Sequence, residues 1–150
     1  MRDLRATYDS VADASYIYLV PHTGPGLVSS SAVLELDASM SAVIVDLDVH
    51  GRIVGIEMLD VSSLVSPKRL GSESLVGACL SYDAAADVAR VDLDPAVEPA
   101  SVRDVALIDT EAHLRVGFDA AGTIVRFEFP DASSILPTSV MTDVDCASGC

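Results

Sequence analysis

The segment from Asp46 to Glu57 has the spacing of acidic residues that comes closest to a metal-binding loop. Its sequence, DLDVHGRIVGIE, nearly fits the calcium-loop pattern D-x-[DN]-x-[DN]-G-x5-E, because Asp46, Asp48, Gly51 and Glu57 stand at the required positions. His50 stands where an oxygen ligand is needed, and Ca²⁺ prefers oxygen ligands. Asp46, Asp48 and Glu57 are therefore weak metal candidates, and we expect neither a bound metal nor a cofactor.

A β-hairpin turn explains the same segment without a metal, and it also explains the similar segment DAAGTIVRFE later in the chain. In a tight turn, an aspartate accepts hydrogen bonds from backbone amides and a glycine adopts positive φ. Asp48 and Gly51 would take these structural roles in the first segment, and Asp119 and Gly122 in the second. We prefer this interpretation because it accounts for both segments.

Two carboxylate pairs follow a tyrosine at identical spacing. They are Asp9 and Asp13 after Tyr8, and Asp83 and Asp87 after Tyr82. A pair four residues apart could serve as acid and base if burial or mutual repulsion shifted one pKa toward neutrality. We favour a structural role, in which each aspartate accepts hydrogen bonds from the amides of a tight turn. Asp9 and Asp13 are also candidates for contact with a partner.

A tyrosine pair distinguishes the first of these segments from the second. Alternation along a strand places Tyr16 and Tyr18 on one face, where the second segment has Arg90 and Asp92. The pair fits either core packing in a protein with few aromatic residues or an exposed recognition patch. We therefore list Tyr16 and Tyr18 with Asp9 and Asp13 as candidate partner-binding residues.

The sequence contains no recognisable catalytic motif. We find no Ser/His/Asp order, GxSxG, Walker or GxGxxG pattern, and His22, His50 and His113 fall in unrelated contexts. We expect Cys79 to be a buried thiol, whereas Cys146 and Cys150 could form a disulfide or join a metal site. No catalytic residue is assigned, and an enzyme is not favoured, although triad partners need not be close in sequence.

The composition excludes one large class of partners. The chain has 150 residues, a formal net charge of -14 and a sequence pI near 4.2. Nucleic-acid binding depends on clustered Lys and Arg, so it is not expected. The sequence has no signal-peptide pattern and no long apolar run, so we expect a cytoplasmic protein without membrane contact. Its high Asp and Arg usage is typical of a prokaryote.

An internal repeat organises the chain. The segment YDSVADASYIYL recurs as YDAAADVARVDL, and DVHGRIVGIEMLDVSS recurs as DAAGTIVRFEFPDASS. We therefore predict repeat units at residues 1–66 and 75–137, a linker at 67–74 and a flexible tail at 138–150. A unit of about 60 residues is marginal alone, so we expect the two units to share a buried face as a monomeric pseudo-dimer, with a homodimer as the alternative.

Periodicity within each unit is that of strands. Strands are predicted at residues 4–8, 14–19 and 32–36, with counterparts at 75–82, 88–93 and 102–108, and each unit then has a hairpin around its turn. The predicted inward residues of the hairpins are Val43, Val45, Leu47, Val54, Ile56 and Met58, and Leu114, Val116, Phe118, Val125, Phe127 and Phe129.

The predicted fold class follows from these strands. It is mainly β, with two antiparallel β-meander units packed face to face and one short helical turn per unit, at 60–64 and 131–136. In the expected hairpin register Asp46 pairs with Ile53, which leaves Glu57 about 13 Å further along the strand at ~3.3 Å per residue. One metal ion could not bridge that distance.

The combination of motifs resembles a known family. Tyr-Asp-x-x-Ala-Asp, an apolar strand and D-x-D-x-x-G-R-I-V-G-I-E-M-L-D-x-S together resemble the bacterial family called domain of unknown function 2283, from Tyr8 to Ser62. The second copy is degenerate, with Arg126 in place of Gly55. The resemblance implies a compact β-rich fold with no established activity or cofactor. Some members resemble the partner half of toxin-antitoxin style gene pairs.

Two functions of different classes follow. The first is a non-catalytic interaction module whose acidic surface attracts a basic protein, as an antitoxin would. The alternative is a small-molecule or divalent-metal site, or an enzyme, at the cleft between the two units, where Asp9, Asp13, Glu57 and the tyrosines could converge.

Overall fold

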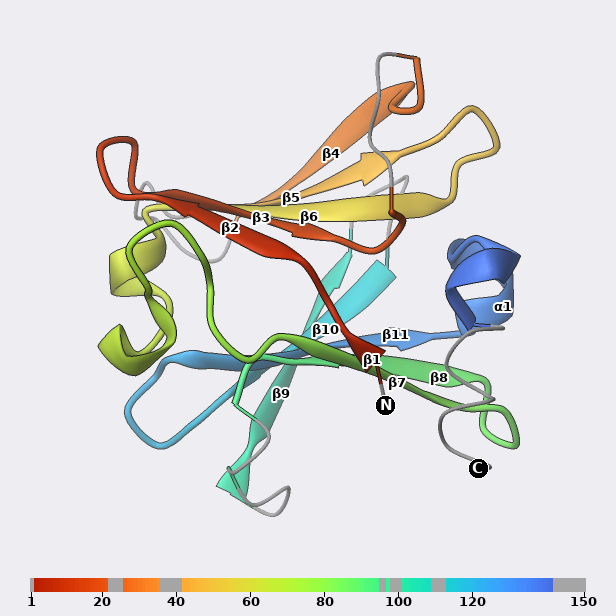
Figure 1. Cartoon of the computed structure of the whole chain (residues 1–150). Coiled ribbons are helices and arrows are strands. Elements are labelled where there is room, and N and C mark those ends of the chain that lie inside the picture. The colour runs from red at the N-terminus through yellow and green to blue at the C-terminus, as the bar shows by residue number, and fades with distance from the viewer. Residues whose placement is uncertain are drawn as a thin grey trace.

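The computed structural model describes residues 2–21, 26–35, 42–94, 97, 101–108 and 113–141. They form two antiparallel β-sheets that lie one above the other, with short helices at the edges (Figure 1). The expectation of a mainly β fold is confirmed. Three histidine and cysteine candidates, His22, Cys146 and Cys150, lie outside the described residues.

The two sheets have corresponding strand orders. The first sheet runs β2 (Ala6–Asp9), β3 (Ala14–Tyr18), β6 (Ile53–Leu59), β5 (Ala42–Leu47) and β4 (Ser30–Glu35). The second sheet runs β1 (Arg2–Asp3), β7 (Cys79–Asp83), β8 (Val88–Asp92), β11 (Ile124–Pro130), β10 (His113–Phe118) and β9 (Arg103–Ile108). In each sheet a hairpin is followed by a strand at the far edge, and the chain then returns to pair beside the hairpin. The strand order is thus not that of one continuous meander.

A β-bulge changes the hairpin register from the one expected. Asp46 pairs with Gly55, not with Ile53, and the register shifts between Asp46 and Leu47. The second sheet has the same irregularity between Gly117 and Phe118. A bulge places two residues opposite one, which a strictly alternating pattern does not reveal. Its consequence is that Glu57 is only two residues beyond the partner of Asp46, so the expected separation of these carboxylates was wrong.

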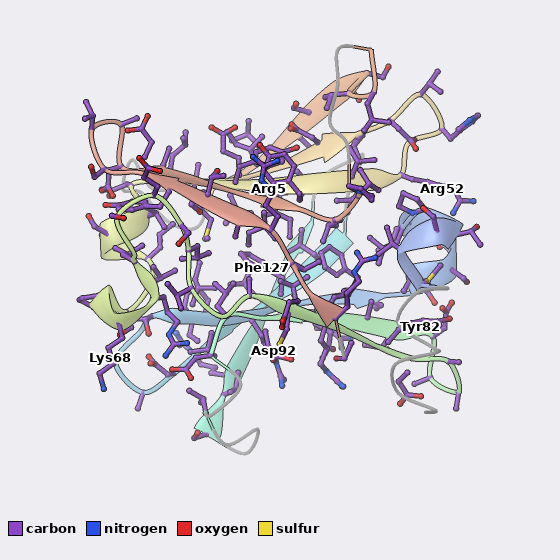
Figure 2. All side chains as sticks on the ribbon, viewed as in Figure 1. Arg5, Arg52, Lys68, Tyr82, Asp92 and Phe127 are labelled. Atoms are coloured by element: carbon purple, nitrogen blue, oxygen red, sulfur yellow. The ribbon has the colours of Figure 1, made fainter. Side chains whose placement is uncertain are left out.

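The core lies between the two sheets and is shared by them. Fully buried side chains include Ile17, Ile56 and Met58 from the first sheet and Leu80, Phe127 and Phe129 from the second. Figure 2 places Phe127 between the sheets. The bulges bring Ile53 and Ile124 into this core cluster, whereas the expected Val54 and Val125 are buried outside it.

Left-handed aspartates tie each hairpin to the short helix that follows its sheet. Asp13 and Asp87 have φ of 51° and 53°. Asp13 accepts hydrogen bonds from the amide and hydroxyl of Ser62 at 3.0 and 2.6 Å, beside the 3-10 helix η1 (Val61–Ser63). Asp87 accepts the same two bonds from Ser133 at 2.9 and 2.6 Å, in α1 (Ala132–Ile135). The repeated aspartate therefore closes the same connection in both halves.

Contacts across the two halves are reciprocal. The Arg52 guanidinium, beside the first hairpin turn, donates to the carbonyls of Ser133 and Leu136 at 3.0 and 2.8 Å. In the other direction, the Ile124 amide, beside the second turn, donates to the carbonyl of Leu64 at 2.6 Å. Figure 2 shows Arg52 next to α1. Each turn thus contacts the helical segment of the opposite half.

The predicted linker and tail are both held in the fold. Residues 67–74 contain the 3-10 helix η2 (Pro67–Arg69), and Ser74 forms an isolated antiparallel β-bridge with Thr7 of β2. Residues 138–141 are helical, with Val140 and Met141 buried in the core. The predicted tail thus begins with a helical turn whose Val140 and Met141 side chains are buried, and residues 142–150 lie outside the described part. Within that part, no helix is long and apolar enough to cross a membrane.

The shared core predicts one unfolding transition. Replacing Phe127 with Ala should lower the free energy of unfolding by about 3–5 kcal/mol, because it leaves a cavity between the sheets. Urea denaturation should be followed by circular dichroism at 218 nm and by tyrosine fluorescence. The two probes should give coincident curves in wild type, and again in F127A at lower urea concentration. Two separate transitions, only one of them shifted by the substitution, would contradict a shared core.

Candidate functional site

The outward face of the first sheet gathers the most unusual group of polar side chains in the described structure. Tyr16 and Tyr18 lie on β3, Glu57 on β6 and Asp46 on β5, all four half-buried. Tyr16 pairs with Glu57 and Asp46 pairs with Gly55, so these residues occupy neighbouring positions on adjacent strands. The intervening residues, such as Ile17 and Ile56, point into the core. We call this the tyrosine face.

Tyr16 is fixed across the sheet by a hydrogen bond that requires Gly55. Its phenolic hydroxyl donates to Oδ2 of Asp46 at 2.8 Å, and the hydroxyl of Ser31 donates to Oδ1 at 2.6 Å. A Cβ at residue 55 would overlap the phenolic oxygen of Tyr16, so the ring can lie over β6 only because Gly55 has no side chain. Burial, followed by the bond to Asp46, raises the pKa of Tyr16 strongly. Tyr16 is therefore a hydrogen-bond donor and not a source of tyrosinate.

Tyr18 extends the same row toward the edge of the molecule. The ring centroids of Tyr16 and Tyr18 are 4.7 Å apart at an interplanar angle of 55°, and the guanidinium carbon of Arg5 lies 4.7 Å from the Tyr18 centroid. Both distances are those of favourable aromatic and cation-π contacts. Figure 2 shows Arg5 on the side of the upper sheet away from Phe127. The row holds two aromatic rings in fixed positions on an accessible surface.

Glu57 differs from Asp46, the other carboxylate of the face, in having no hydrogen-bond donor beside it in the described part of the chain. Burial, and then repulsion from Asp46, raises the pKa of Glu57 above its ordinary value. Among the described residues it forms no hydrogen bond or ion pair. A carboxylate that is half-buried beside a second carboxylate destabilises the folded state when it is ionised.

The equivalent position of the second sheet is fully paired. Glu128 of β11 is buried and accepts hydrogen bonds from Arg90 Nε at 2.8 Å and Arg115 Nη1 at 2.9 Å. Arg90 and Arg115 are the strand neighbours of Glu128, as Tyr16 and Ile44 are the strand neighbours of Glu57. The two outward faces therefore differ at the same positions: one satisfies its glutamate internally and the other does not.

Two shallow hollows flank the tyrosine pair. One has a volume of about 200 Å³ and is lined by Thr7, Tyr8, Asp9, Ala14, Ser15, Tyr16 and Glu57. The other has a volume of about 220 Å³ and is lined by Arg2, Asp3, Leu4, Arg5, Tyr18, Leu19, Val20 and Pro21. The hollow beside Tyr16 is acidic and the hollow beside Tyr18 contains two arginines, so the face offers opposite charges on its two sides.

The other candidate aspartates lie in turns. Asp9 and Asp83 accept hydrogen bonds from the amides of their own hairpin turns. Hydrogen bonds from the hydroxyl groups of Ser62 and Ser133 lower the pKa values of Asp13 and Asp87. Asp13 is engaged within the fold by Ser62 and by the Tyr8 hydroxyl, while Asp9 lines the acidic hollow.

The turn glycines and their aspartates also lie in the hairpin turns. Asp48 accepts bonds from the amides of His50 and Arg52, and Gly51 has φ of 77°. Asp119 accepts bonds from the amides of Ala121 and Thr123 and from the Thr123 hydroxyl, which lowers its pKa, and Gly122 has φ of 82°.

The geometry does not bring the weak metal candidates together. Asp48 belongs to the turn, whereas Asp46 is engaged by Tyr16 and Ser31. The residues that the structure describes contain no group of three His, Cys, Asp or Glu side chains able to hold a metal ion. The junction between the two halves is filled by apolar core side chains, and the tyrosines and Glu57 lie on the opposite side of the first sheet.

Sequence reasoning missed Gly55, Ser31 and Arg5 as parts of this face. One signal for Gly55 was present in the sequence: the second half has Arg126 in place of Gly55, and the same half lacks both tyrosines. Ser31 and Arg5 carry no motif, because their contacts come from strands that are distant in sequence.

Comparison with known proteins gives one match. Residues 5–62, which contain most of the first sheet and all four residues of the tyrosine face, match the model of the family described as protein of unknown function DUF2283. No curated protein and no solved structure matches the chain. The family description assigns no activity, so the function must be argued from the site.

The contrast between the two glutamates predicts opposite effects of the same substitution. Because the folded-state pKa of Glu57 is raised, its ionisation disfavours folding, and this cost is absent below its unfolded pKa and grows as pH rises through the folded pKa. E57Q should therefore stabilise the protein at pH 7, by less than about 1 kcal/mol because the side chain is partly exposed, and have no effect at pH 3.

The matched substitution E128Q should destabilise the protein at pH 7 by about 1–2 kcal/mol, because it weakens two charge-assisted hydrogen bonds. Urea denaturation of both variants at the two pH values provides the measurement. Destabilisation by E57Q at pH 7 would mean that Glu57 has a favourable partner.

The packing of the Tyr16 ring over Gly55 gives a spectroscopic prediction. In G55A the new methyl group displaces the Tyr16 ring and breaks its bond to Asp46, so one additional tyrosine should ionise near the ordinary tyrosine pKa. The measurement is a tyrosinate absorbance titration, with Y16F as the control that lacks this group. Identical titration curves for G55A and wild type would refute the role of Gly55.

Proposed function

We propose that this protein is a non-catalytic interaction module that binds a basic protein through the tyrosine face. The observation that carries the proposal is the unpaired Glu57, held beside Asp46 and two ordered tyrosines. Groups that cost stability in the free protein are expected at functional sites, where a partner compensates them. Since the missing component is positive charge, the partner should be basic at its contact surface.

The aromatic row supports a protein partner. Tyrosine supplies a large rigid contact area at low entropic cost and is enriched among residues that dominate binding energy. The hydrogen bond of Tyr16 and the cation-π contact of Tyr18 hold both rings in place before binding. Preorganisation of this kind lowers the entropic cost of association.

The overall charge supports the same class of partner. The chain carries 23 acidic residues and 9 Lys and Arg, and its formal net charge is -14. A field of one sign accelerates the encounter with a partner of opposite charge and falls with ionic strength. An antitoxin-like role, neutralising a small basic protein in a prokaryotic cytoplasm, fits this chemistry and is part of the proposal.

We further propose that the second half is a degenerate copy of the first that has kept a structural role. In support, the second sheet apart from β1 has the same strand order as the first, with the same bulge and left-handed aspartates. Leu4 and Ala78, which have the same spacing as Tyr8 and Tyr82, meet where the halves join, with the Leu4 amide 2.9 Å from the Ala78 carbonyl. A two-fold axis relating the copies would pass through such a pair.

The alternative of a ligand or catalytic site at the junction of the halves has no comparable support. The residues assigned to it, Asp13 and Glu57 among them, do not converge there, and apolar side chains fill the junction. A nucleophile with a neighbouring base is not found among the described residues.

The test is capture of a basic protein from native lysate at low ionic strength, with wild type and charge-matched variants each used as bait. The double variant D46N/E57Q and the control D131N/E73Q remove the same charge, but only the first alters the tyrosine face; Asp131 has no side-chain capping bond and Glu73 is exposed. Wild type and control should retain one basic protein, and D46N/E57Q and Y16A/Y18A should bind it about tenfold more weakly or not at all.

Rising salt should elute the captured protein. Equal loss of binding in the control and the face variants would show that net charge alone acts, and retention of no basic protein by wild type would refute the proposed function.

A further inference from the structure

The second sheet provides an internal template for what the tyrosine face lacks. Glu128 holds two guanidinium groups, from Arg90 and Arg115 on either side of it. The corresponding neighbours of Glu57 are Tyr16 and Ile44, neither of which carries a charge. A glutamate at this position of the fold therefore has the geometry to accept guanidinium groups, and in the first sheet none is supplied by the described residues.

The space for such a group is already present. The Tyr16 hydroxyl reaches across Gly55 and bonds to Asp46. Tyr16 therefore does not bond to Glu57, whereas Arg90, at the corresponding position, bonds to Glu128. An accessible hollow of about 200 Å³ remains beside Glu57, with Asp9, Thr7 and the rings of Tyr8 and Tyr16 in its lining. The hollow thus combines an unpaired carboxylate, a second carboxylate and aromatic surface.

We propose that the acidic hollow of the tyrosine face binds an arginine side chain of the partner, which pairs with Glu57. This inference rests on the proposed function and names the group that the face recognises. The guanidinium would take the place relative to Glu57 that Arg90 takes relative to Glu128, so the partner completes in trans the ion pair that the second half forms within the chain.

Arginine fits this hollow better than lysine does. The planar guanidinium can donate two bonds to one carboxylate and still stack on an aromatic ring, whereas an ammonium is more strongly hydrated and donates from a point. The tyrosine face already contains one such stack, of Arg5 on Tyr18 at 4.7 Å. An arginine in the hollow would add an equivalent contact beside Tyr16.

The first experiment needs no partner. The free protein is titrated with N-acetyl-arginine methylamide, with the lysine and citrulline analogues as probes that lack the guanidinium or its charge. Binding is followed by NMR shifts of the backbone amides that line the hollow, which can be observed in both wild type and E57Q. The arginine probe should saturate the signal with an affinity about tenfold or more above that of either analogue. Equal affinities for the arginine and lysine probes, or saturation that E57Q leaves unchanged, would overturn the proposal.

A cis-complemented variant provides the second experiment. I44R places an arginine at the position that corresponds to Arg115 beside Glu128. This arginine should pair with Glu57 within the chain and lower the affinity for the arginine probe about tenfold. I44Q, of similar length but uncharged, should bind the probe as wild type does. Equal binding by I44R and I44Q, with both variants folded by circular dichroism, would refute the site.

The outcomes separate this inference from the proposed function. If a basic protein is captured through the tyrosine face but the arginine probe neither binds nor competes, the arginine site is wrong and the interaction module stands. If the probe binds at Glu57 but no basic protein is captured, the arginine site stands and the proposed partner class is wrong.

Discussion

The constraint on which the structure depends is that neither sheet can bury its apolar face alone. A unit of about 60 residues is only marginally stable by itself, and the two inner faces meet in one core that contains Phe127 and Phe129. The contacts of Arg52 and Ile124 join the two halves in that arrangement, and the left-handed aspartates fix the short helix of each half. With both inner faces buried in the core, only the two outer faces remain exposed.

The two outer faces differ in how they treat the glutamate at the corresponding strand position. The second sheet surrounds Glu128 with arginines, which satisfies a buried charge within the fold. The first sheet has Tyr16 and Ile44 at the corresponding positions, so Glu57 lies beside Asp46 without a neighbouring arginine. The Tyr16 bond to Asp46 over Gly55 fixes the ring on the first sheet, and preorganisation of this kind lowers the entropic cost of binding.

Much of the fold could be predicted from alternation and turn chemistry, because strand periodicity and the Asp and Gly turn residues are local signals. The strand ranges, the hairpins and the helical turns near Asp60 and Asp131 followed from them. The bulges could not be predicted, since an extra residue leaves the apolar pattern almost unchanged, and the pairing of Asp46 with Gly55 was missed for that reason. The contrast of Tyr16 and Tyr18 with Arg90 and Asp92 was visible, but the missing counterion of Glu57 depends on strand neighbours that only the three-dimensional structure identifies.

The most direct test of the central claim is the pKa of the Glu57 carboxyl in the free protein, measured by following its side-chain carbon resonance through a pH titration, with E57Q used to assign the signal. The account predicts a pKa above the ordinary glutamate value, because the group is partly buried next to Asp46 and has no cation among the described residues. A pKa at or below the ordinary value would show that the Glu57 carboxylate is already stabilised within the protein. It would contradict the proposal that the tyrosine face binds a positively charged partner.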